Sequence, residues 1–380
     1  MSRSKSRIDL LLYAHDGRGL GHASRGVAVG AAVRRLYPQL KVLFLSGCRQ
    51  TAALIGPVPL DWIKLPAYEK VMVKGTPQAR VGDTNLKNSY LVKSRTRLLQ
   101  AIMAEYRPRC VLVDHEAPGK RAELVPSIES TPDTSWILGL RGIIGRVEDV
   151  WSQAALAIFK KHYRALFWYG DESVLGGESL HAIEIRYGVQ PFITGYVSRL
   201  KEVLSWTQPA APADRPNAGT IAVSWNSPAA TSVLTSLQQA LARMGDRYGP
   251  WRIFTNSDKA LFKDLPFCRV EDLSPNYLYA LLNSKTALIY GGYNSITDIL
   301  SAKVPSLVLL RDVSDREQED HLAKLAASGQ TALHVISETD ISAEKLQASL
   351  EKLLHTSWPQ KSRLNLDGAE NAARKIVEYL

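Results

Sequence analysis

A glycine-rich loop ending in a histidine lies near the start of the chain. It reads Asp16-Gly17-Arg18-Gly19-Leu20-Gly21-His22 and follows a short apolar run. Glycines let the backbone approach a ligand closely, and the amino terminus of a following helix favours negative charge. A histidine at that place can act as a general base near neutral pH, because the unperturbed imidazole pKa is about 6.5. The alternatives are a histidine that only caps the helix and a tight turn that binds nothing.

A dinucleotide-binding fingerprint is another interpretation of this loop. That fingerprint needs an acidic residue about 20 residues further on, at the end of the second strand, to hold the ribose. The second expected strand, 41–46, ends in Leu45-Ser46 and is followed by Gly47, without an acid. The sequence therefore argues against an NAD or FAD site.

A glycine pair late in the chain, Gly291-Gly292, follows an expected strand and opens a helix. The pair frees backbone amides, and the Ser295 hydroxyl adds a donor where a diphosphate could be held. Asp298 lies about one helical turn further on, where its carboxylate could accept hydrogen bonds from ribose hydroxyls. The alternative is an ordinary capped helix with an acid near its start.

A third polar segment contains Glu317 and Gln318, after an expected strand at 306–310. Ser314 or Asp315 can cap the next helix, which places Glu317 and Gln318 in its first turn. An acid and an amide at that place suit recognition of sugar hydroxyls. Alone, the segment would be an ordinary charged helix start.

Apolar runs alternate with helical patterns along the chain, which is typical of βαβ units and a mostly parallel sheet. The alternation stops at 207–219, a stretch with three prolines and no apolar periodicity, as in an interdomain linker. We therefore expect an α/β protein of two doubly wound domains, whose ligands would bind at the carboxyl ends of the strands. The expected strands are 8–14, 41–46, 110–114, 136–140, 220–224, 251–254, 287–290 and 306–310, and the expected helices are 22–36, 89–105, 230–243, 275–283, 295–302, 316–328 and 368–380.

Length and composition limit the protein class. A chain of 380 residues is long for one hydrophobic core and sufficient for two. No apolar run approaches the roughly 18 residues that span a bilayer, and the apolar stretch near the amino terminus is too short for a secretion signal. The three cysteines are far apart, which argues against a disulfide framework or a zinc site. We expect a cytoplasmic protein.

The formal net charge of +10 predicts an anionic partner. Basic residues interleaved with apolar ones concentrate between positions 70 and 109, which would suit a lipid-linked acceptor or an anionic membrane. The alternative is a solvated helical face. We expect no nucleic acid, because no zinc finger, RRM signature or helix-turn-helix pattern is present. The basic residues are Lys70, Lys74, Arg80, Lys87, Lys93, Arg95, Arg97, Arg107 and Arg109.

Together the polar loops carry a resemblance to a known family. The chain resembles GT-B glycosyltransferases related to the bacterial N-acetylglucosaminyltransferase that completes lipid II. It is most similar to a branch of predicted bacterial glycosyltransferases marked by HD-x-x-G-L-G-H, here His15 to His22. The resemblance spans nearly the whole chain in motif order. The further matching stretches are Val113-Asp114-His115-Glu116-Ala117-Pro118-Gly119, Leu138-Gly139-Leu140-Arg141, Tyr169-Gly170-Asp171, Gly195-Tyr196-Val197-Ser198-Arg199, Gly292-Tyr293-Asn294-Ser295 and Glu317-Gln318.

The resemblance implies a GT-B fold, with two Rossmann-like domains facing a central cleft. It implies an acceptor-binding domain at 1–199, a linker at 200–218, a nucleotide-sugar-binding domain at 219–366, and a helix at 367–380 that could pack back on the first domain. The donor would be a nucleotide-diphosphate sugar, with UDP as the expected nucleotide and no further cofactor. The acceptor would be a small or lipid-linked molecule, and contact with the inner face of an anionic membrane is compatible with the basic region.

The resemblance also assigns roles to single residues. His22 matches the proposed base, and we expect Asp16 to orient it. The donor residues would be Gly291, Gly292, Asn294 and Ser295 at the phosphates, Asp298 at the ribose, Glu317 and Gln318 near the sugar, and Arg269 and Val270 near the base. Residues expected near the acceptor or a phosphate are Gly19, Gly21, Asp114, Glu116, Arg141, Ser224 and Asn226.

One loop departs from the family pattern. After the first strand of the second domain the family usually has glycines, whereas this chain has Ser224-Trp225-Asn226-Ser227-Pro228. A hydroxyl and an amide could still meet a phosphate there. No convincing D-x-D follows a strand, so we expect a metal-independent transfer. In-line attack of the acceptor on the anomeric carbon would make it inverting. The alternatives are a nucleotide-sugar 2-epimerase or hydrolase on the same fold, and a non-catalytic nucleotide-sugar-binding scaffold.

Overall fold

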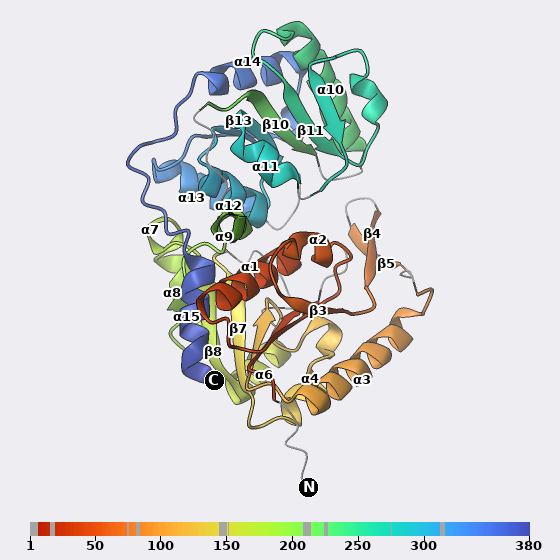
Figure 1. Ribbon diagram of the computed structural model, residues 1–380, viewed down its shortest axis with the longest axis vertical. Coiled ribbons are helices and arrows are strands. Elements are labelled where there is room, and N and C mark those ends of the chain that lie inside the picture. The colour runs from red at the N-terminus through yellow and green to blue at the C-terminus, as the bar shows by residue number, and fades with distance from the viewer. Residues whose placement is uncertain are drawn as a thin grey trace. The chain divides into compact units, whose positions relative to one another are not determined.

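Two parallel sheets organise the chain, one in each of two compact units (Figure 1). The computed structural model describes residues 7–15, 20–73, 76–80, 84–143, 150, 152–207, 214–223, 227–274, 276–311 and 316–380. The first unit comprises Met1–Thr207 and Asn365–Leu380, and the second comprises Gln208–Leu364. The predicted α/β class with two Rossmann-like domains is confirmed.

The first unit contains a seven-stranded sheet of order β3-β2-β1-β6-β7-β8-β9, with every pair parallel. A separate antiparallel hairpin, β4-β5, precedes helix α3. The strands are β1 (Leu10–Ala14), β2 (Val42–Ser46), β3 (Asp61–Lys64), β4 (Glu69–Val73), β5 (Thr76–Arg80), β6 (Cys110–Asp114), β7 (Ser135–Arg141), β8 (Tyr163–Tyr169) and β9 (Phe192–Ile193). The helices are α1 (Leu20–Leu36), α2 (Thr51–Ile55), α3 (Asn88–Tyr106), η1 (Lys120–Ala122), α4 (Val125–Glu129), α6 (Gln153–His162), α7 (Glu172–Leu175), α8 (Glu178–Tyr187), α9 (Arg199–Thr207), α15 (Gly368–Ile376) and η4 (Val377–Tyr379).

The second unit contains a six-stranded parallel sheet of order β12-β11-β10-β13-β14-β15. Counted within the unit, this is the 3-2-1-4-5-6 order of a dinucleotide-binding fold. The strands are β10 (Asn217–Val223), β11 (Trp251–Thr255), β12 (Cys268–Glu271), β13 (Ser284–Tyr290), β14 (Ser306–Leu310) and β15 (Leu333–Ser337). The helices are α10 (Pro228–Met244), η2 (Lys259–Phe262), α11 (Asn276–Leu282), α12 (Tyr293–Ala302), α13 (Glu317–Ala327), η3 (Glu338–Asp340) and α14 (Ala343–Leu354).

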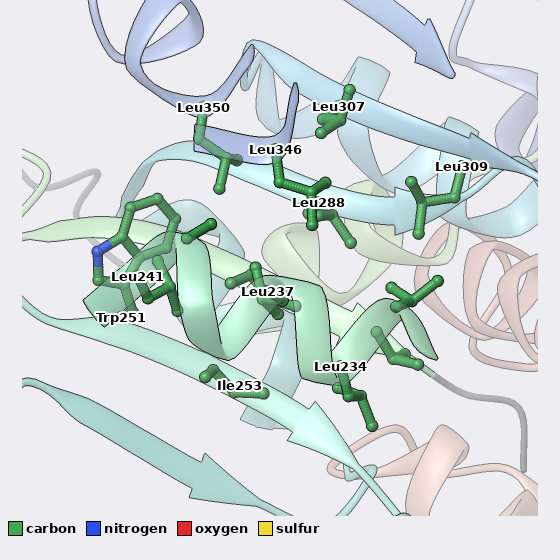
Figure 2. Packing of buried hydrophobic residues seen from close by; sticks show 14 of the residues in the cluster. Leu234, Leu237, Leu241, Trp251, Ile253, Leu288, Leu307, Leu309, Leu346 and Leu350 are labelled. Atoms are coloured by element: carbon green, nitrogen blue, oxygen red, sulfur yellow. The ribbon is translucent and has the colours of Figure 1, made fainter. Parts of the chain in front are cut away.

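An apolar core lies between the second sheet and two of its helices, α10 and α14. Figure 2 shows Leu234, Leu237 and Leu241 of α10 packed against strand residues and against α14. The apolar spacing along α10 places these leucines on one stripe of the helix. The other labelled members are Trp251 and Ile253 of β11, Leu288 of β13, Leu307 and Leu309 of β14, and Leu346 and Leu350 of α14.

Two of the glycines in helix α1, Gly26 and Gly30, allow the helix to pack closely against the first sheet. A Cβ at Gly26 would lie 2.8 Å from the Phe44 ring, and one at Gly30 would lie 2.8 Å from side chains of both Leu12 and Leu60. The close packing brings the first turns of α1 against the end of β1. The position of the residues that α1 carries therefore depends on these two glycines.

The carboxyl-terminal segment returns to the first unit. The Tyr196 amide donates to the Asn365 carbonyl (2.8 Å), the buried Asp171 carboxylate accepts from the Asn365 amide, and α15 packs on α1. Gly195 has a φ of +91°, and a Cβ there would lie 2.4 Å from the Asn365 side chain. Two of the stretches behind the resemblance, at 169–171 and 195–199, thus bind the returning chain.

Helix α9 occupies the first part of the stretch expected as a linker. Leu200, Glu202 and Val203 are buried, and the Trp206 indole donates to the Ala31 carbonyl of α1 (3.3 Å). Helix α9 therefore belongs to the first unit, and strand β10 of the second unit begins at Asn217. No helix in the described part of the chain combines the length and apolarity needed to cross a membrane.

Replacing Gly26 by Ala should destabilise the first unit by about 1–3 kcal/mol, because the added methyl would overpack against the fully buried Phe44. Chemical denaturation followed by circular dichroism measures the change. In a Phe44→Leu background the same substitution should cost less, since the smaller side chain relieves the contact. An equal cost in both backgrounds would show that the contact is not the cause.

Candidate functional site

The carboxyl ends of β1 and β6 form the first candidate site. These two strands are neighbours at the point where strand order reverses, which is where ligands bind in open parallel sheets. Helix α1 follows β1 and carries His22 as its third residue, while β6 ends at Asp114. The fold therefore brings together two residues that are 92 positions apart in the sequence.

His22, Asp114 and Arg25 form a hydrogen-bonded cluster. His22 Nδ1 makes a short contact with Asp114 Oδ2. Arg25 Nε donates to Asp114 Oδ1 (2.9 Å), and Arg25 Nη2 donates to Asp114 Oδ2 (2.6 Å). Asp114 and Arg25 are buried, whereas 17% of the His22 side chain is exposed. The Asp114 carboxylate is thus bound by both Arg25 and His22. Of the three side chains, that of His22 is the most accessible to solvent.

Asp114 stays ionised in this buried position. Burial alone raises the pKa of its carboxyl, but the charges of Arg25 and His22 and their hydrogen bonds outweigh burial, so the pKa lies well below its usual range. A carboxylate that orients a histidine through Nδ1 leaves Nε2 as the nitrogen that can take a proton. The pair therefore has the arrangement of a general base and its orienting group.

Two further histidines flank His22. The ring centroids of His15 and His115 lie 4.6 Å and 5.3 Å from that of His22, and both side chains are buried. Burial, followed by the charge of His22, lowers the pKa of His15 well below its usual range. Burial, followed by the charge of Arg141, likewise lowers the pKa of His115 well below its usual range. Both flanking imidazoles are therefore neutral at physiological pH.

His115 also has an unusual backbone conformation. Its φ is +76°, a region that a residue with a side chain rarely adopts. Its amide donates to the Gly139 carbonyl of β7 (2.8 Å), which holds the strand end in place. Strained residues of this kind gather at functional sites, where the surrounding structure fixes them.

Glu116 and Arg141, both expected near the acceptor, lie at the same edge of the sheet. Glu116 is buried, accepts a hydrogen bond from Lys120 Nζ (2.7 Å), and lies 3.5 Å from His15 Nε2. Arg141 is the last residue of β7, the neighbour of β6. The structure thus brings Glu116 and Arg141 to the His22 site.

A buried ion pair beneath this site was missed in the sequence. Arg95 of α3 and Glu123 are both inaccessible to solvent and are joined by two hydrogen bonds of 2.6 Å and 2.5 Å. The hydroxyls of Tyr13 and Tyr68 also reach the Glu123 carboxylate. Arg95 is one of the basic residues expected to form a charged surface between positions 70 and 109. Its side chain is fully buried, so that expectation is wrong for Arg95.

The signal for these missed residues is a charge in an apolar stripe. Arg95 occupies the helical stripe formed by Leu91, Leu99 and Met103, all buried. Arg25 likewise lies in a run of α1 that is buried from Ala23 to Val33. A charged residue at such a position must be paired, because an isolated buried charge is too costly. The sequence contains the signal but does not name the partner.

The second candidate site lies where β13 leads into α12. The Gly291 amide donates to the Leu309 carbonyl (3.0 Å), and Gly292 is the residue before the first helical position. A Cβ on Gly292 would meet no atom within 4 Å, so its surroundings are open. The amides of the first helical turn, which includes Asn294 and Ser295, have no partner within the helix and can bind an anion.

The acid and amide residues expected near this loop lie on adjacent helices. Asp298 is buried one turn into α12, and Glu317 and Gln318 are the first two residues of α13. A Cβ on Gly291 would lie 3.4 Å from Gln318 Oε1, which places the start of α13 beside the glycine pair. The residue before α13 is Arg316, which has a φ of +51° and whose side chain makes no capping hydrogen bond. The expected caps, Ser314 and Asp315, lie outside the described residues.

Other expected residues are more distant or not described. Arg269 and Val270 lie on β12, the edge strand, with β11 and β10 between them and β13. The Arg269 side chain is exposed and lies 3.4 Å from Glu271, and Val270 packs on the core. Gly21 is the second residue of α1. Asp16, Gly19, Ser224 and Asn226 lie outside the described residues.

Stability should fall as the pH decreases from about 7.5 to 5, with His115 as one cause. Its folded-state pKa is depressed, so below the ordinary histidine pKa only the unfolded chain takes up the proton. For each such group, the free energy of unfolding falls by up to about 1.4 kcal/mol per pH unit. His115→Gln should flatten the pH dependence of the unfolding free energy, and His181→Gln, at an exposed position, should not. An unchanged slope in His115→Gln would contradict the assignment.

Comparison with known proteins supports the architecture. No protein-family model and no curated protein sequence matches the chain. Among solved structures, MurG from Acinetobacter baumannii aligns over 97% of this chain and 95% of its own, with 13% identity and a TM-score of 0.52. The glycosyltransferase SnogD from Streptomyces nogalater covers 98% and 94%, with 16% identity and a TM-score of 0.57.

Not every similar structure is a glycosyltransferase. UDP-GlcNAc 2-epimerase from Neisseria meningitidis, solved with UDP-GlcNAc bound, covers 98% of both chains, with 14% identity and a TM-score of 0.57. At these identities the likeness concerns the fold. The chain therefore has the GT-B fold, shared by glycosyltransferases that include MurG and by UDP-GlcNAc 2-epimerases.

Proposed function

We propose that the protein is a glycosyltransferase that moves a sugar from a nucleotide-diphosphate donor to an acceptor nucleophile. The observation that carries the proposal is the His22–Asp114 pair at the switch point of the first sheet. This pair gives the chain a base oriented through Nδ1, at the edge where open sheets bind ligands. A scaffold that only binds a nucleotide sugar has no need of such a base.

The proposed reaction is a direct displacement. The acceptor hydroxyl gives its proton to His22 Nε2, and its oxygen forms a bond to the anomeric carbon of the donor sugar. The bond from that carbon to the diphosphate oxygen breaks, and its electron pair leaves with the nucleoside diphosphate. Attack opposite the leaving group inverts the anomeric configuration. The Nδ1 proton stays on the His22 ring, where it donates to Asp114. The negative charge of the Asp114 carboxylate stabilises the imidazolium that forms.

The second unit supplies the proposed donor site. The open space at Gly292 and the first-turn amides at Asn294 and Ser295 suit a diphosphate, and the helix dipole favours its charge. Asp298 would hold the ribose, and Glu317 and Gln318 the sugar. We propose that these groups, with cationic side chains, balance the leaving-group charge without a metal.

We propose UDP as the nucleotide, with its base at the far edge of the same sheet. Strand β12 is three strand positions from β13, roughly 14 Å at the usual strand spacing. A nucleoside diphosphate that extends along the carboxyl edge from Gly291 would bring its base toward Arg269 and Val270. Backbone groups of β12, the edge strand, would then bind the base.

Replacing His22 by Gln should lower the transfer rate by about 10²- to 10⁴-fold, because the acceptor loses its base. Donor binding, measured by thermal shift with UDP and UDP-sugars, should remain, since the proposed donor residues belong to the second unit. His181→Gln, at an exposed histidine of α8, is the matched control. Turnover that survives in His22→Gln would refute the proposed role.

An epimerase or hydrolase on the same fold is the second candidate, favoured by the similarity to UDP-GlcNAc 2-epimerase. Such an enzyme needs no acceptor. Release of UDP should therefore be measured with and without candidate acceptors. Acceptor-dependent release supports the transferase, and equal release without an acceptor supports a hydrolase. Conversion of the UDP-sugar to its 2-epimer without net release of UDP supports an epimerase. No reaction with any donor supports a non-catalytic scaffold.

We also propose that the acceptor is lipid-linked and that the protein is cytoplasmic, reaching the acceptor at the inner face of the membrane. Helix α3 carries three of the six exposed large hydrophobic residues of the described chain, namely Tyr90, Leu98 and Tyr106. Lys93 and Arg97 line a hollow of about 420 Å³ together with Tyr90, Ser94 and Leu98, and none of these described lining residues is acidic. Aromatic and cationic side chains in this arrangement suit an anionic lipid surface.

Reversing both charges, as Lys93→Glu with Arg97→Glu, should weaken binding to phosphatidylglycerol vesicles at least about 30-fold, since each basic residue contributes about 1 kcal/mol. Cosedimentation measures the change. The double reversal Lys345→Glu with Lys352→Glu, on exposed positions of α14, should have a smaller effect. Equal losses would indicate attraction by net charge instead of a specific face.

A further inference from the structure

Arg25 occupies a special place in the His22 site. It lies three residues after His22 on α1, so both side chains leave the same face of the helix. Arg25 is 3% exposed, so it does not itself reach a ligand in solvent. Its Nε and Nη2 bonds to Asp114 run side by side, one to each carboxylate oxygen, in the paired geometry that only a guanidinium provides.

The cluster allows two arrangements of the His22 proton. With hydrogen on Nδ1, the ring donates to Asp114 and leaves Nε2 unprotonated. With hydrogen on Nε2, the Nδ1 lone pair would accept from Arg25 Nη2, which lies 3.1 Å away. Asp114 Oδ2 is closer to Nδ1 than Arg25 is. An unprotonated Nδ1 would face the carboxylate lone pairs, which is repulsive, so this geometry favours hydrogen on Nδ1.

The position of Asp114 therefore decides which nitrogen of His22 is free, and Arg25 holds that position. The carboxylate has three donors, and two of them come from Arg25. Without Arg25, two of these three hydrogen bonds are lost and the carboxylate could rotate away from His22. The free imidazole prefers hydrogen on Nε2, so loss of the Asp114 contact would release His22 to the unproductive form.

We propose that Arg25 is a positioning residue, which fixes Asp114 so that His22 keeps hydrogen on Nδ1 and presents Nε2 to the acceptor. This inference rests on the proposed function for its catalytic consequence. The tautomer itself can be observed in the absence of any substrate. In this arrangement the Arg25 guanidinium of α1 holds the Asp114 carboxylate of β6, and that carboxylate orients the His22 imidazole.

The test compares tautomers and rates in Arg25→Met and Arg25→Lys. Two-bond ¹H–¹⁵N correlation spectra of protein labelled with ¹⁵N-histidine distinguish the two neutral tautomers, and His22→Gln assigns the His22 signal. The native protein should show hydrogen on Nδ1, and Arg25→Met should shift His22 toward hydrogen on Nε2. In the transfer assay, kcat should fall about 10- to 100-fold with little change in the donor KM, and Arg25→Lys should recover part of the loss.

Two further variants calibrate the result. Asp114→Asn should give the Nε2 tautomer outright, because the amide can present N–H to Nδ1. Arg35→Met removes a cation from the other end of α1, where Arg35 binds Glu202 and Glu370, and should leave the tautomer and kcat unchanged. If Arg25→Met does not fold, Arg25→Lys is judged by the same spectrum.

The outcomes separate this inference from the proposed function. An unshifted His22 tautomer in folded Arg25→Met, or in Arg25→Lys where only that variant folds, overturns the inference, even if the native protein is an active transferase. A shifted tautomer in a protein without transferase activity supports the inference and refutes the function. A loss of kcat without a tautomer shift assigns Arg25 to another role and likewise overturns the inference.

Discussion

The first unit depends on one buried carboxylate, that of Asp114. An ionised acid at the end of a buried parallel strand is costly unless donors surround it. Arg25 and His22 provide those donors from the start of α1, and they hold the pKa of Asp114 well below its usual range. The close approach of α1 to the sheet, permitted by Gly26 and Gly30, is what brings the donors within reach.

A second buried ion pair, Arg95 with Glu123, stabilises the same edge of the first sheet. Arg95 and Glu123 connect α3 to the segment after η1, and Tyr13 attaches the pair to β1. Removing one partner from such a pair typically costs about 3–5 kcal/mol, because the remaining charge stays buried. The strand end that precedes His15 and the loop that follows Asp114 are therefore held by a common polar network.

The two candidate sites use the same element of the fold in different ways. In the second unit the start of α12 offers backbone amides around Gly292, in open surroundings that suit an anion. In the first unit the start of α1 carries side chains that meet a carboxylate instead. The same arrangement of a strand, a loop and a helix amino terminus is thus proposed as an anion site in one unit and as the place of a proton acceptor in the other.

The sequence by itself determined the fold class, both glycine-lined helix openings and His22 as a candidate base, because alternation, glycines and residue type are local features of the chain. Only the tertiary structure decided which acid meets His22. The sequence suggested Asp16, which lies outside the described residues, and it gave no sign that parallel pairing of β1 with β6 brings Asp114 to the imidazole. The partners of Arg25 and Arg95 were equally hidden, since residue spacing along a chain carries no record of strand order or of which charges share a buried site.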